Sequence, residues 1–275
     1  MSESDLSDWE WERLQPLMPK PSTGRPAHNH RRILNGIFWI LRTGAPWREL
    51  PWRYGPWPTV ANRFYRWRQA GIWERIWTEL QQLAQQRCQL DWNQHFIDST
   101  AVQAHQHAAG APRTPDQNEC LGRSRGGLST KVHLRTDGMG KPLVLALTAG
   151  HQNDAPMFLP LMRPVQLNGP GPGRPRSQPH RLVADKAYSS RAIRRYAHRR
   201  NIRLTIPHKR NESQTGPFDR NSYRKRNRIE RAFNRFKECR RLATARDARA
   251  QRYEKRAQNY RAMWVVATIL LWFRL

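Results

Sequence analysis

The sequence SYRKRNRIERAFNRFKECRR, residues 222–241, places Tyr223, Arg226, Glu230 and Lys237 at successive spacings of three, four and seven residues. In a helix that turns about 100° per residue, these four side chains fall within about 60° of one another and share one face. The adjacent arc is apolar and consists of Ile229, Phe233 and Phe236. The pattern predicts a helix that buries one side and presents a single carboxylate inside a positively charged surface. Such a carboxylate suits a site that holds a cation next to a polyanion.

The chain is strongly basic. Its 275 residues include 49 Lys and Arg against 21 Asp and Glu, which gives a formal net charge of +28. A charge of this size indicates nucleic acid as the main partner, and arginine, which outnumbers lysine here, is the better fork for phosphate oxygens. A membrane surface is an alternative partner. A further alternative is that the charge only keeps the protein solvated and marks no partner. The hydrophobic content of 38% is adequate for a packed core in one large domain or two smaller ones.

Cysteine usage and both ends of the chain favour a reducing cytoplasm. Cys88, Cys120 and Cys239 show no CxxC spacing, so neither a zinc knuckle nor a disulfide framework is predicted. The N-terminal segment lacks the basic start and apolar core of a signal peptide. The apolar run 262–273 is 12 residues long, shorter than the ~20 needed to cross a bilayer. We expect a buried helix there and no membrane partner.

The first part of the chain, up to about Cys88, has a helical pattern broken by turns rich in Pro and Gly. One apolar-periodic helix is predicted from His30 to Leu41, and another from Pro58 to about Gln69. The second has an apolar side with Val60, Phe64 and Trp67 and a polar side with Asn62, Arg63, Arg66 and Gln69. This resembles a helix-turn-helix arrangement in which the polar side reaches DNA bases. The alternative is a small helical bundle whose arginines are only a solvated surface.

From Asn93 onward the pattern changes to strands and loops. Strands are expected at HFIDSTAV (95–102), KVHLRTD (131–137), PLVLALTAG (142–150), RLVADKAY (181–188) and IRLTIP (202–207). The turn DGMGK makes a hairpin of the second and third, GRSRGG (122–127) is expected to be a loop, and helices are expected from Asp154 and from about Ser190 to Arg200. This order of elements predicts an α/β fold.

Two aspartates follow apolar runs in matching ways: Asp98 after Phe96 and Ile97, and Asp185 after a run ending in Ala184. Each is predicted at the C-terminal end of a strand, the edge of an α/β sheet where ligands gather. Glu230 on the basic helix would complete a trio. Three carboxylates suit Mg²⁺, and two such ions support in-line attack on a phosphodiester. The alternative for each acid alone is a turn former, a helix cap or an ion pair.

Other polar residues fit structural roles better. Asp137 is expected in the hairpin turn and Asp154 as a helix N-cap. His105 and His107 lack a further ligand at a zinc spacing, which favours a polar loop.

Several of these segments together resemble a known family. FIDST (96–100), GRSRGGLSTKVHL (122–134), VADKAY (183–188) and the spacing of Tyr223, Arg226, Glu230 and Lys237 are similar to the DDE transposases of bacterial insertion sequences, in the insertion-sequence-five family. The segments 25–51 and 54–67 are similar to the region that these enzymes carry ahead of their catalytic domain. The resemblance covers nearly the whole chain, and the glutamate-centred signature is its most specific part.

The resemblance implies a ribonuclease-H-like catalytic domain, a mixed sheet flanked by helices, over residues 91–275. A small all-α domain with helix-turn-helix character precedes it over residues 1–90. It also implies that Asp98, Asp185 and Glu230 form a metal-binding catalytic triad for two Mg²⁺ ions, with Mn²⁺ as a substitute. Arg226 and Lys237 are expected to contact DNA, as are Tyr223 on the same face and Arg63 and Arg66 in the first domain.

The function implied is DNA transposition. The first domain would bind the terminal inverted repeats of the element, and the second would cleave the 3′ ends and join them to target DNA. The partner is double-stranded DNA, the assembly on it a homodimer or higher oligomer, and the location the bacterial cytoplasm at the nucleoid. Two alternatives stay open: a ribonuclease-H-like nuclease without strand transfer, and a non-catalytic DNA-binding regulator.

Overall fold

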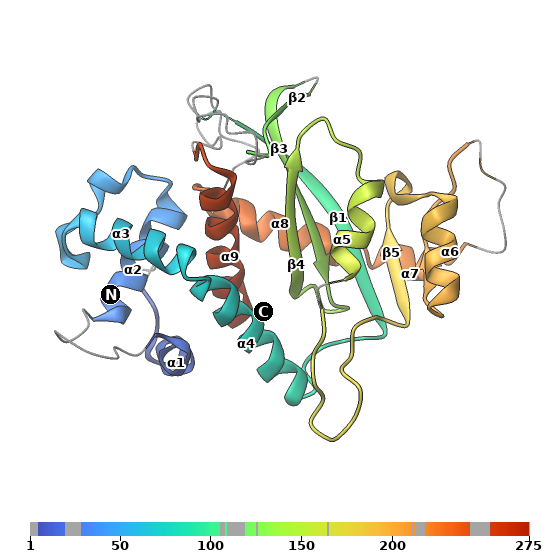
Figure 1. The fold of residues 1–275 in the computed structure, drawn as a ribbon, viewed down its shortest axis with the longest axis horizontal. Helices are drawn as coiled ribbons and strands as arrows, with labels where there is room; N and C mark the ends of the chain where they lie inside the picture. The colour runs from blue at the N-terminus through green and yellow to red at the C-terminus, as the bar shows by residue number, and fades with distance from the viewer. Residues whose placement is uncertain are drawn as a thin grey trace. The chain divides into compact units, whose positions relative to one another are not determined.

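The computed structural model describes residues 5–19, 29–104, 108, 119–124, 126–163, 165–210, 212, 218–242 and 254–274. His105 and His107 lie outside these residues. The chain divides into two compact units (Figure 1). The helical unit comprises Met1–Leu80, His105–Thr114 and Phe236–Leu275, and the sheet unit comprises Gln81–Ala104 and Pro115–Arg235.

The helical unit is built from amphipathic helices with well-defined ends. Its helices are α1 (Asp8–Leu14), α2 (His30–Thr43), α3 (Trp57–Gln69) and α9 (Ala257–Arg274), with short 3-10 turns η1 (Gln15–Leu17), η2 (Trp47–Glu49) and η3 (Trp52–Tyr54); α4 (Ile72–Gln86) begins here and ends in the sheet unit. Ser7 starts α1 through a capping box, in which its hydroxyl accepts from the Glu10 N–H and the Glu10 carboxylate accepts from the Ser7 N–H. Gly44 ends α2 in the left-handed conformation.

The two helices predicted in the N-terminal region are confirmed as α2 and α3. Val60, Phe64 and Trp67 are at most 3% exposed, so the apolar side of α3 is buried as its periodicity indicates. Helix α3 contacts both α2 and α9. The apolar spacing therefore fixed which side of α3 faces the core and which side is left for solvent or a ligand.

The C-terminal apolar run is confirmed as a buried helix. In α9, Met263, Trp264, Val265 and Val266 have no exposed surface. From Ala262 to Leu271 the helix is buried on all sides, and it contacts α2 and α3 within the helical unit. Within the described residues, none of the helices has both the length and the apolarity to cross a membrane.

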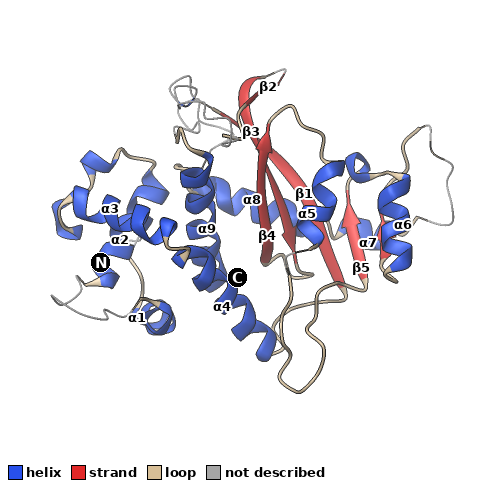
Figure 2. Cartoon of the chain, viewed as in Figure 1, coloured by secondary structure: helices blue, strands red, loops and turns tan. Residues whose placement is uncertain are grey.

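The sheet unit has a mixed sheet with the strand order of a ribonuclease-H-like fold (Figure 2). Its strands are β1 (Gln94–Gln103), β2 (Gly122–Ser124), β3 (Gly127–Thr136), β4 (Pro142–Ala149), β5 (Arg181–Ala184) and β6 (Arg203–Thr205). Five of these strands follow one another in space as β4, β3, β1, β5 and β6, and β2 pairs with β3. Strand β3 is antiparallel to β1 and β4, whereas β5 is parallel to β1 and β6 is parallel to β5. The predicted fold class and the predicted hairpin of β3 and β4 are confirmed.

The segment GRSRGG was expected to be a loop, and this prediction is wrong for its first part. Gly122–Ser124 forms β2, which pairs antiparallel with β3 between Gly122 and Ser129 and between Ser124 and Gly127. Gly127 has φ +100°, a conformation that a residue with a side chain rarely adopts, and this allows the chain to fold back at once. Pairing with β3 gives the backbone of this glycine-rich stretch its hydrogen bonds.

The helices of the sheet unit follow the strands in the predicted order. They are η5 (Ala155–Met157), α5 (Phe158–Met162), η6 (Lys186–Tyr188), α6 (Arg191–Arg199), α7 (Arg220–Arg224) and α8 (Asn227–Glu238), of which α8 continues into the helical unit. Helix α5 contacts β3 and β4, α6 contacts β6, and α7 contacts β5.

The signature segment does not form one continuous helix, so that prediction is wrong. Helix α7 ends at Arg224, and α8 starts at Asn227 after a turn at Lys225 and Arg226. The apolar arc of α8 is nevertheless buried, with Ile229 and Phe236 at 0% exposure. Two tertiary contacts accompany this turn, and helical periodicity does not predict either of them. Arg226, in the turn, donates to Asp98 on β1, and Ile229, at the start of α8, is buried in the core.

The division into units differs from the sequence boundary at residue 90. Residues from Phe236 onward are grouped with the N-terminal helices, and the sheet unit begins at Gln81. The assignment of DNA recognition to residues 1–90 and of catalysis to residues 91–275 is a functional one and stays a prediction.

Candidate active site

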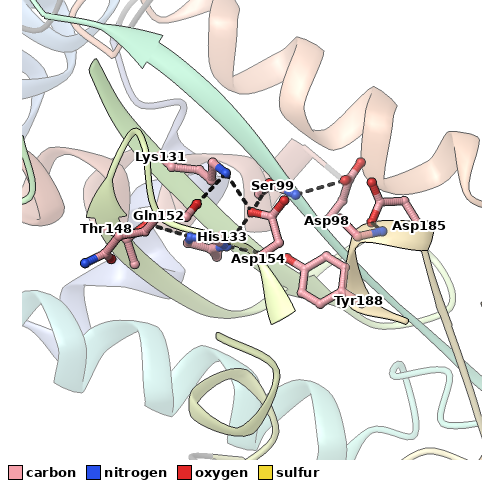
Figure 3. Close-up of polar contacts among 10 residues, drawn as sticks. Asp98, Ser99, Lys131, His133, Thr148, Gln152, Asp154, Asp185 and Tyr188 are labelled. Carbon is pink, nitrogen blue, oxygen red and sulfur yellow. Dashed lines mark hydrogen bonds and ion pairs between the residues drawn. The ribbon is translucent and has the colours of Figure 1, made fainter. Parts of the chain in front are cut away.

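Two carboxylates lie on neighbouring parallel strands. Strand β1 pairs with β5 in a register that sets Ile97 against Ala184, so the next residues, Asp98 and Asp185, come side by side. Asp185 directly follows β5, as predicted. Asp98 was expected at the end of its strand but lies within β1, which continues to Gln103 because β3 extends the pairing on its other side. The close-up shows the two carboxyl groups next to each other (Figure 3).

The Asp98 carboxylate is nearly buried and has two donors. Its Oδ2 accepts from Arg226 Nη2 at 2.7 Å, and its Oδ1 accepts from the Ser99 N–H at 2.9 Å. Burial raises the pKa of Asp98 to about 6; Arg226 and the Ser99 N–H lower it, and the nearby Asp185 raises it again. The carboxylate therefore lies where additional positive charge would be stabilising.

The Asp185 carboxylate is fixed by the turn that follows it. Its Oδ1 accepts from the Ala187 N–H at 3.0 Å, which caps η6. The same turn places Tyr188, whose side chain is fully buried, beside both aspartates (Figure 3).

Glu230 is linked to the aspartate pair through an arginine. Arg226 Nη1 lies 3.1 Å from Glu230 Oε1, while Nη2 of the same guanidinium bonds Asp98. The Glu230 side chain is 52% exposed, against 10% for Asp98. In the described part of the chain, no three His, Cys, Asp or Glu side chains come close enough to enclose a metal ion. The structure thus brings Asp98 and Asp185 together and holds Glu230 one guanidinium away.

The other residues of the signature have separate surroundings. Tyr223 lies on α7, half-buried, with its ring 5.2 Å from that of Phe218. Lys237 lies on α8 in the part of that helix that belongs to the helical unit. Within the described part of the sheet unit, Tyr223 makes no hydrogen bond or ion pair with Asp98 or Asp185.

Arg63 and Arg66 both lie on α3 of the helical unit but differ in exposure. Arg66 is exposed, whereas Arg63 is half-buried and lies over the Trp67 ring, with 5.7 Å between its Cζ and the ring centroid. Burial and the adjacent Arg66 lower the pKa of Arg63. Arg66 is therefore the more accessible of the two for a ligand.

A cluster beside Asp98 was missed by the sequence reasoning. Asp154 occupies the predicted N-cap position before η5, but its side chain makes no capping hydrogen bond, so its predicted role as a cap is wrong. Its Oδ1 instead accepts from Ser99 Oγ at 2.9 Å and lies 3.1 Å from Lys131 Nζ and 3.7 Å from His133 Nδ1. The signal available in the sequence was the alternation of Lys131 and His133, which places both side chains on one face of a strand.

The chemistry of the aspartate pair fits a hard divalent cation. Two carboxylates at adjacent strand positions supply the oxygen ligands that Mg²⁺ prefers, with remaining positions for water and phosphate oxygens. Asp185 disfavours ionisation of Asp98, and a bound cation would remove that repulsion. Asp98 and Asp185 are the residues that would hold the ion.

Two family profiles together match most of the chain. The profile "Putative transposase of IS4/5 family" matches residues 6–77, and the profile "Transposase DDE domain" matches residues 95–272. An uncharacterized protein y4sN of Sinorhizobium fredii is 40% identical over 110 residues, which are 39% of this chain and 83% of that protein. A putative transposase for insertion sequence element IS6501 of Brucella ovis is 28% identical over 149 residues, which are 54% of this chain and all of that protein.

Solved structures of the Mos1 transposase also align with the chain, at low similarity. Its paired-end complex with the left transposon end has a TM-score of 0.25 and 11% identity, and covers 79% of this chain and 81% of that one. Its strand transfer complex has a TM-score of 0.27 and 11% identity, and covers 93% and 79%. Membership rests instead on the family profiles, since the DDE profile alone spans more than half of the chain. The chain belongs to the DDE transposases of the IS4/5 family of insertion sequences.

Proposed function

We propose that this transposase binds the terminal inverted repeats of its element, cleaves their 3′ ends and joins those ends to target DNA. The observation that carries the proposal is the placement of Asp98 beside Asp185 on parallel strands, with Arg226 connecting Asp98 to Glu230. Cleavage and joining are both in-line displacements at phosphorus, so one arrangement of carboxylates serves both steps.

Each carboxylate has a distinct part in this proposal. Asp98 and Asp185 hold the metal site, and Glu230 completes it after its contact with Arg226 is released. When bound, two Mg²⁺ ions would supply activation of water or of a 3′-hydroxyl and stabilisation of the leaving oxygen, and Mn²⁺ would substitute. Before metal binds, the positive charge of Arg226 compensates the negative charges of Asp98 and Glu230. This matters because a nearly buried carboxylate without a partner is strongly destabilising.

Two groups of residues are proposed to bind DNA. Arg63 and Arg66 on α3 contact the inverted repeat, and Tyr223, Arg226 and Lys237 contact the DNA near the cut. The net charge of +28 supports phosphate contacts by both groups of residues. Because two element ends must be joined, we also propose that a homodimer or higher oligomer forms on the DNA.

The test is a cleavage assay on labelled DNA that carries the sequence flanking the gene, with Mg²⁺ or Mn²⁺. The wild type should nick at fixed end positions and form joined products. Asp98→Asn and Glu230→Gln should lose both products while binding the same DNA nearly as well. Glu238→Gln is the matched control, because it removes the same charge from an exposed position on the same helix.

Three outcomes would contradict parts of the proposal. Full cleavage by Glu230→Gln would remove that residue from the site. Metal-dependent nicks without joined products would indicate a ribonuclease-H-like nuclease. Specific binding without metal-dependent cleavage by the wild type would indicate a DNA-binding regulator.

A further inference from the structure

The cluster around Asp154 touches the aspartate pair without being part of it. Asp154 follows β4, whereas Lys131 and His133 lie on β3. Lys131 and His133 lie next to the Asp154 carboxylate, which accepts from the hydroxyl of Ser99 on β1, and Ser99 is opposite His133 in the antiparallel register of β1 and β3. Three segments that are distant in sequence thus converge directly behind Asp98 (Figure 3).

Ser99 connects this cluster to Asp98 through two groups of one residue. Its N–H donates to Asp98 Oδ1 at 2.9 Å, and its hydroxyl donates to Asp154 Oδ1 at 2.9 Å. A carboxylate that accepts the hydroxyl fixes the rotamer of Ser99. The orientation of the Ser99 side chain and backbone in turn restrains the carboxyl group that its N–H contacts.

Tyr188 makes a second connection, toward Asp185. Its hydroxyl lies 3.4 Å from His133 Nδ1, and it ends the η6 turn that Asp185 caps. The other nitrogen of the imidazole, Nε2, is 2.8 Å from Thr148 Oγ1 on β4. Both ring nitrogens of His133 therefore have a polar neighbour. Through Tyr188, His133 connects the turn after β5 to the cluster that contains Ser99.

The negative charge of Asp154 is compensated where it lies. Lys131 Nζ is 3.1 Å from Asp154 Oδ1 and also donates to the Gln152 carbonyl at 2.8 Å. The Lys131 and Asp154 side chains are only 17% and 15% exposed. This ion pair is shielded from solvent, and local capping does not explain the position of Asp154 because its side chain makes no capping bond.

We propose that Asp154 is a positioning residue of the metal site: through Ser99 it orients Asp98, and through His133 and Tyr188 it fixes the turn that carries Asp185. The inference rests on the proposed function, in which those two aspartates hold the ions. Residues that orient metal ligands in this way commonly change metal affinity about 10- to 100-fold when they are removed.

The experiment measures Mn²⁺ binding to the full-length protein by electron paramagnetic resonance, without DNA. Ser99→Ala and Asp154→Ala are each expected to raise the Kd for Mn²⁺ about tenfold. Because Ser99→Ala breaks only the connection through Ser99 and Asp154→Ala also removes the contact with His133, the double variant should bind Mn²⁺ about as weakly as Asp154→Ala alone. Ser99→Ala removes one hydroxyl, so it keeps the test valid if Asp154→Ala does not fold.

Asp219→Asn is the matched control, because Asp219 also accepts from a serine, Ser222, and pairs with an arginine, but at the start of α7. It should leave the Kd unchanged. Unchanged Mn²⁺ binding in Ser99→Ala, or independent effects that multiply in the double variant, would overturn the positioning role. The proposed function fails separately: it is contradicted if Asp98→Asn binds Mn²⁺ as tightly as the wild type.

Discussion

At the scale of single residues, Arg226 shows how one side chain serves two acids. Its guanidinium contacts the nearly buried Asp98 and the half-exposed Glu230 through different nitrogens. Arginine suits this place because its planar fork donates in two directions at once, which a lysine does not do with fixed geometry. Burial lowers the pKa of Arg226, but the charges of Asp98, Tyr223 and Glu230 outweigh it and raise this pKa above its usual value.

His133 is expected to make stability depend on pH. Burial lowers its pKa to about 4; Asp154 opposes this shift and Lys131 adds to it. The unfolded chain gains a proton on this imidazole near pH 6.5, while the folded chain does not until near pH 4. The contribution of the neutral His133 imidazole to the free energy of unfolding is therefore fully present above about pH 6.5. It is lost as the pH falls toward 4, by on the order of 3 kcal/mol.

The measurement is urea unfolding of the wild type and His133→Gln between pH 7 and pH 4. The variant should start less stable at pH 7, because the bond to Thr148 is disturbed, and should lose less stability on acidification. His180→Gln, at an exposed position, should follow the wild type. An equal loss in His133→Gln and the wild type would show that this imidazole does not cause the dependence.

At the scale of elements, the ends of helices are set by residues with special conformations. Gly44 ends α2 at φ +72° and donates its N–H to the Ile40 carbonyl. Gly71, between α3 and α4, has a similar φ of +64°. The two differ in surroundings: a Cβ at Gly44 would lie 3.1 Å from the Arg240 Cβ, whereas a Cβ at Gly71 would meet nothing within 4 Å.

Gly44→Ala and Gly71→Ala should therefore destabilise the protein by different amounts. Gly71→Ala should cost about 1 to 2 kcal/mol, the cost of the left-handed conformation alone. Gly44→Ala should cost about 1 kcal/mol more, because the backbone and side chain of Arg240 must also move. Denaturant unfolding of both variants measures the difference, and equal losses would mean that the contact with Arg240 relaxes freely.

A buried arginine joins elements within the sheet unit. Arg135 on β3 is fully buried and donates to His95 on β1, to the Leu161 and Met162 carbonyls at the end of α5, and to the Ser177 carbonyl. Burial lowers its pKa to about 9. Its bonds satisfy carbonyls that the end of a helix leaves without partners, so one side chain attaches α5 to the sheet.

At the scale of the whole molecule, the dominant property is charge. With a net charge of +28, binding to DNA should release many counterions. If about six phosphates are neutralised, affinity should fall on the order of 10³-fold between 50 and 200 mM salt. Filter binding or fluorescence anisotropy with the cognate end measures this slope, and a fall of less than about tenfold would contradict a phosphate-dominated interface.

The same titration separates base contacts from phosphate contacts on α3. If Arg66 or Arg63 reads bases, its replacement by Ala should cost about 1 to 3 kcal/mol on the cognate end and less on random DNA. Arg75→Ala, at an exposed position on α4, is the control and should weaken both DNAs alike. If Arg63→Ala and Arg66→Ala lose equal affinity for both DNAs, these residues contact phosphates and do not read bases.

Features that depend on neighbours along the chain were predictable from the amino-acid sequence. Apolar periodicity predicted α2, α3 and the buried side of α8, and the turn DGMGK predicted the hairpin of β3 and β4. The match of short segments to a family identified the transposase and pointed to Asp98, Asp185 and Glu230. The predictions of the helices and the hairpin are confirmed because helix faces and turn preference are local properties, whereas the assignment of the three carboxylates to a catalytic site stays a prediction.

Features that depend on segments far apart in the sequence became visible only in the folded chain. The parallel register of β1 and β5 places Asp98 beside Asp185, and the pairing of β1 with β3 carries β1 beyond Asp98. The break between α7 and α8 and the diversion of Asp154 from a cap to Ser99 were not predicted. Periodicity predicts which face of a helix or strand a residue lies on. Which residue it contacts on that face depends on the strand register and on how buried charges are paired within the core.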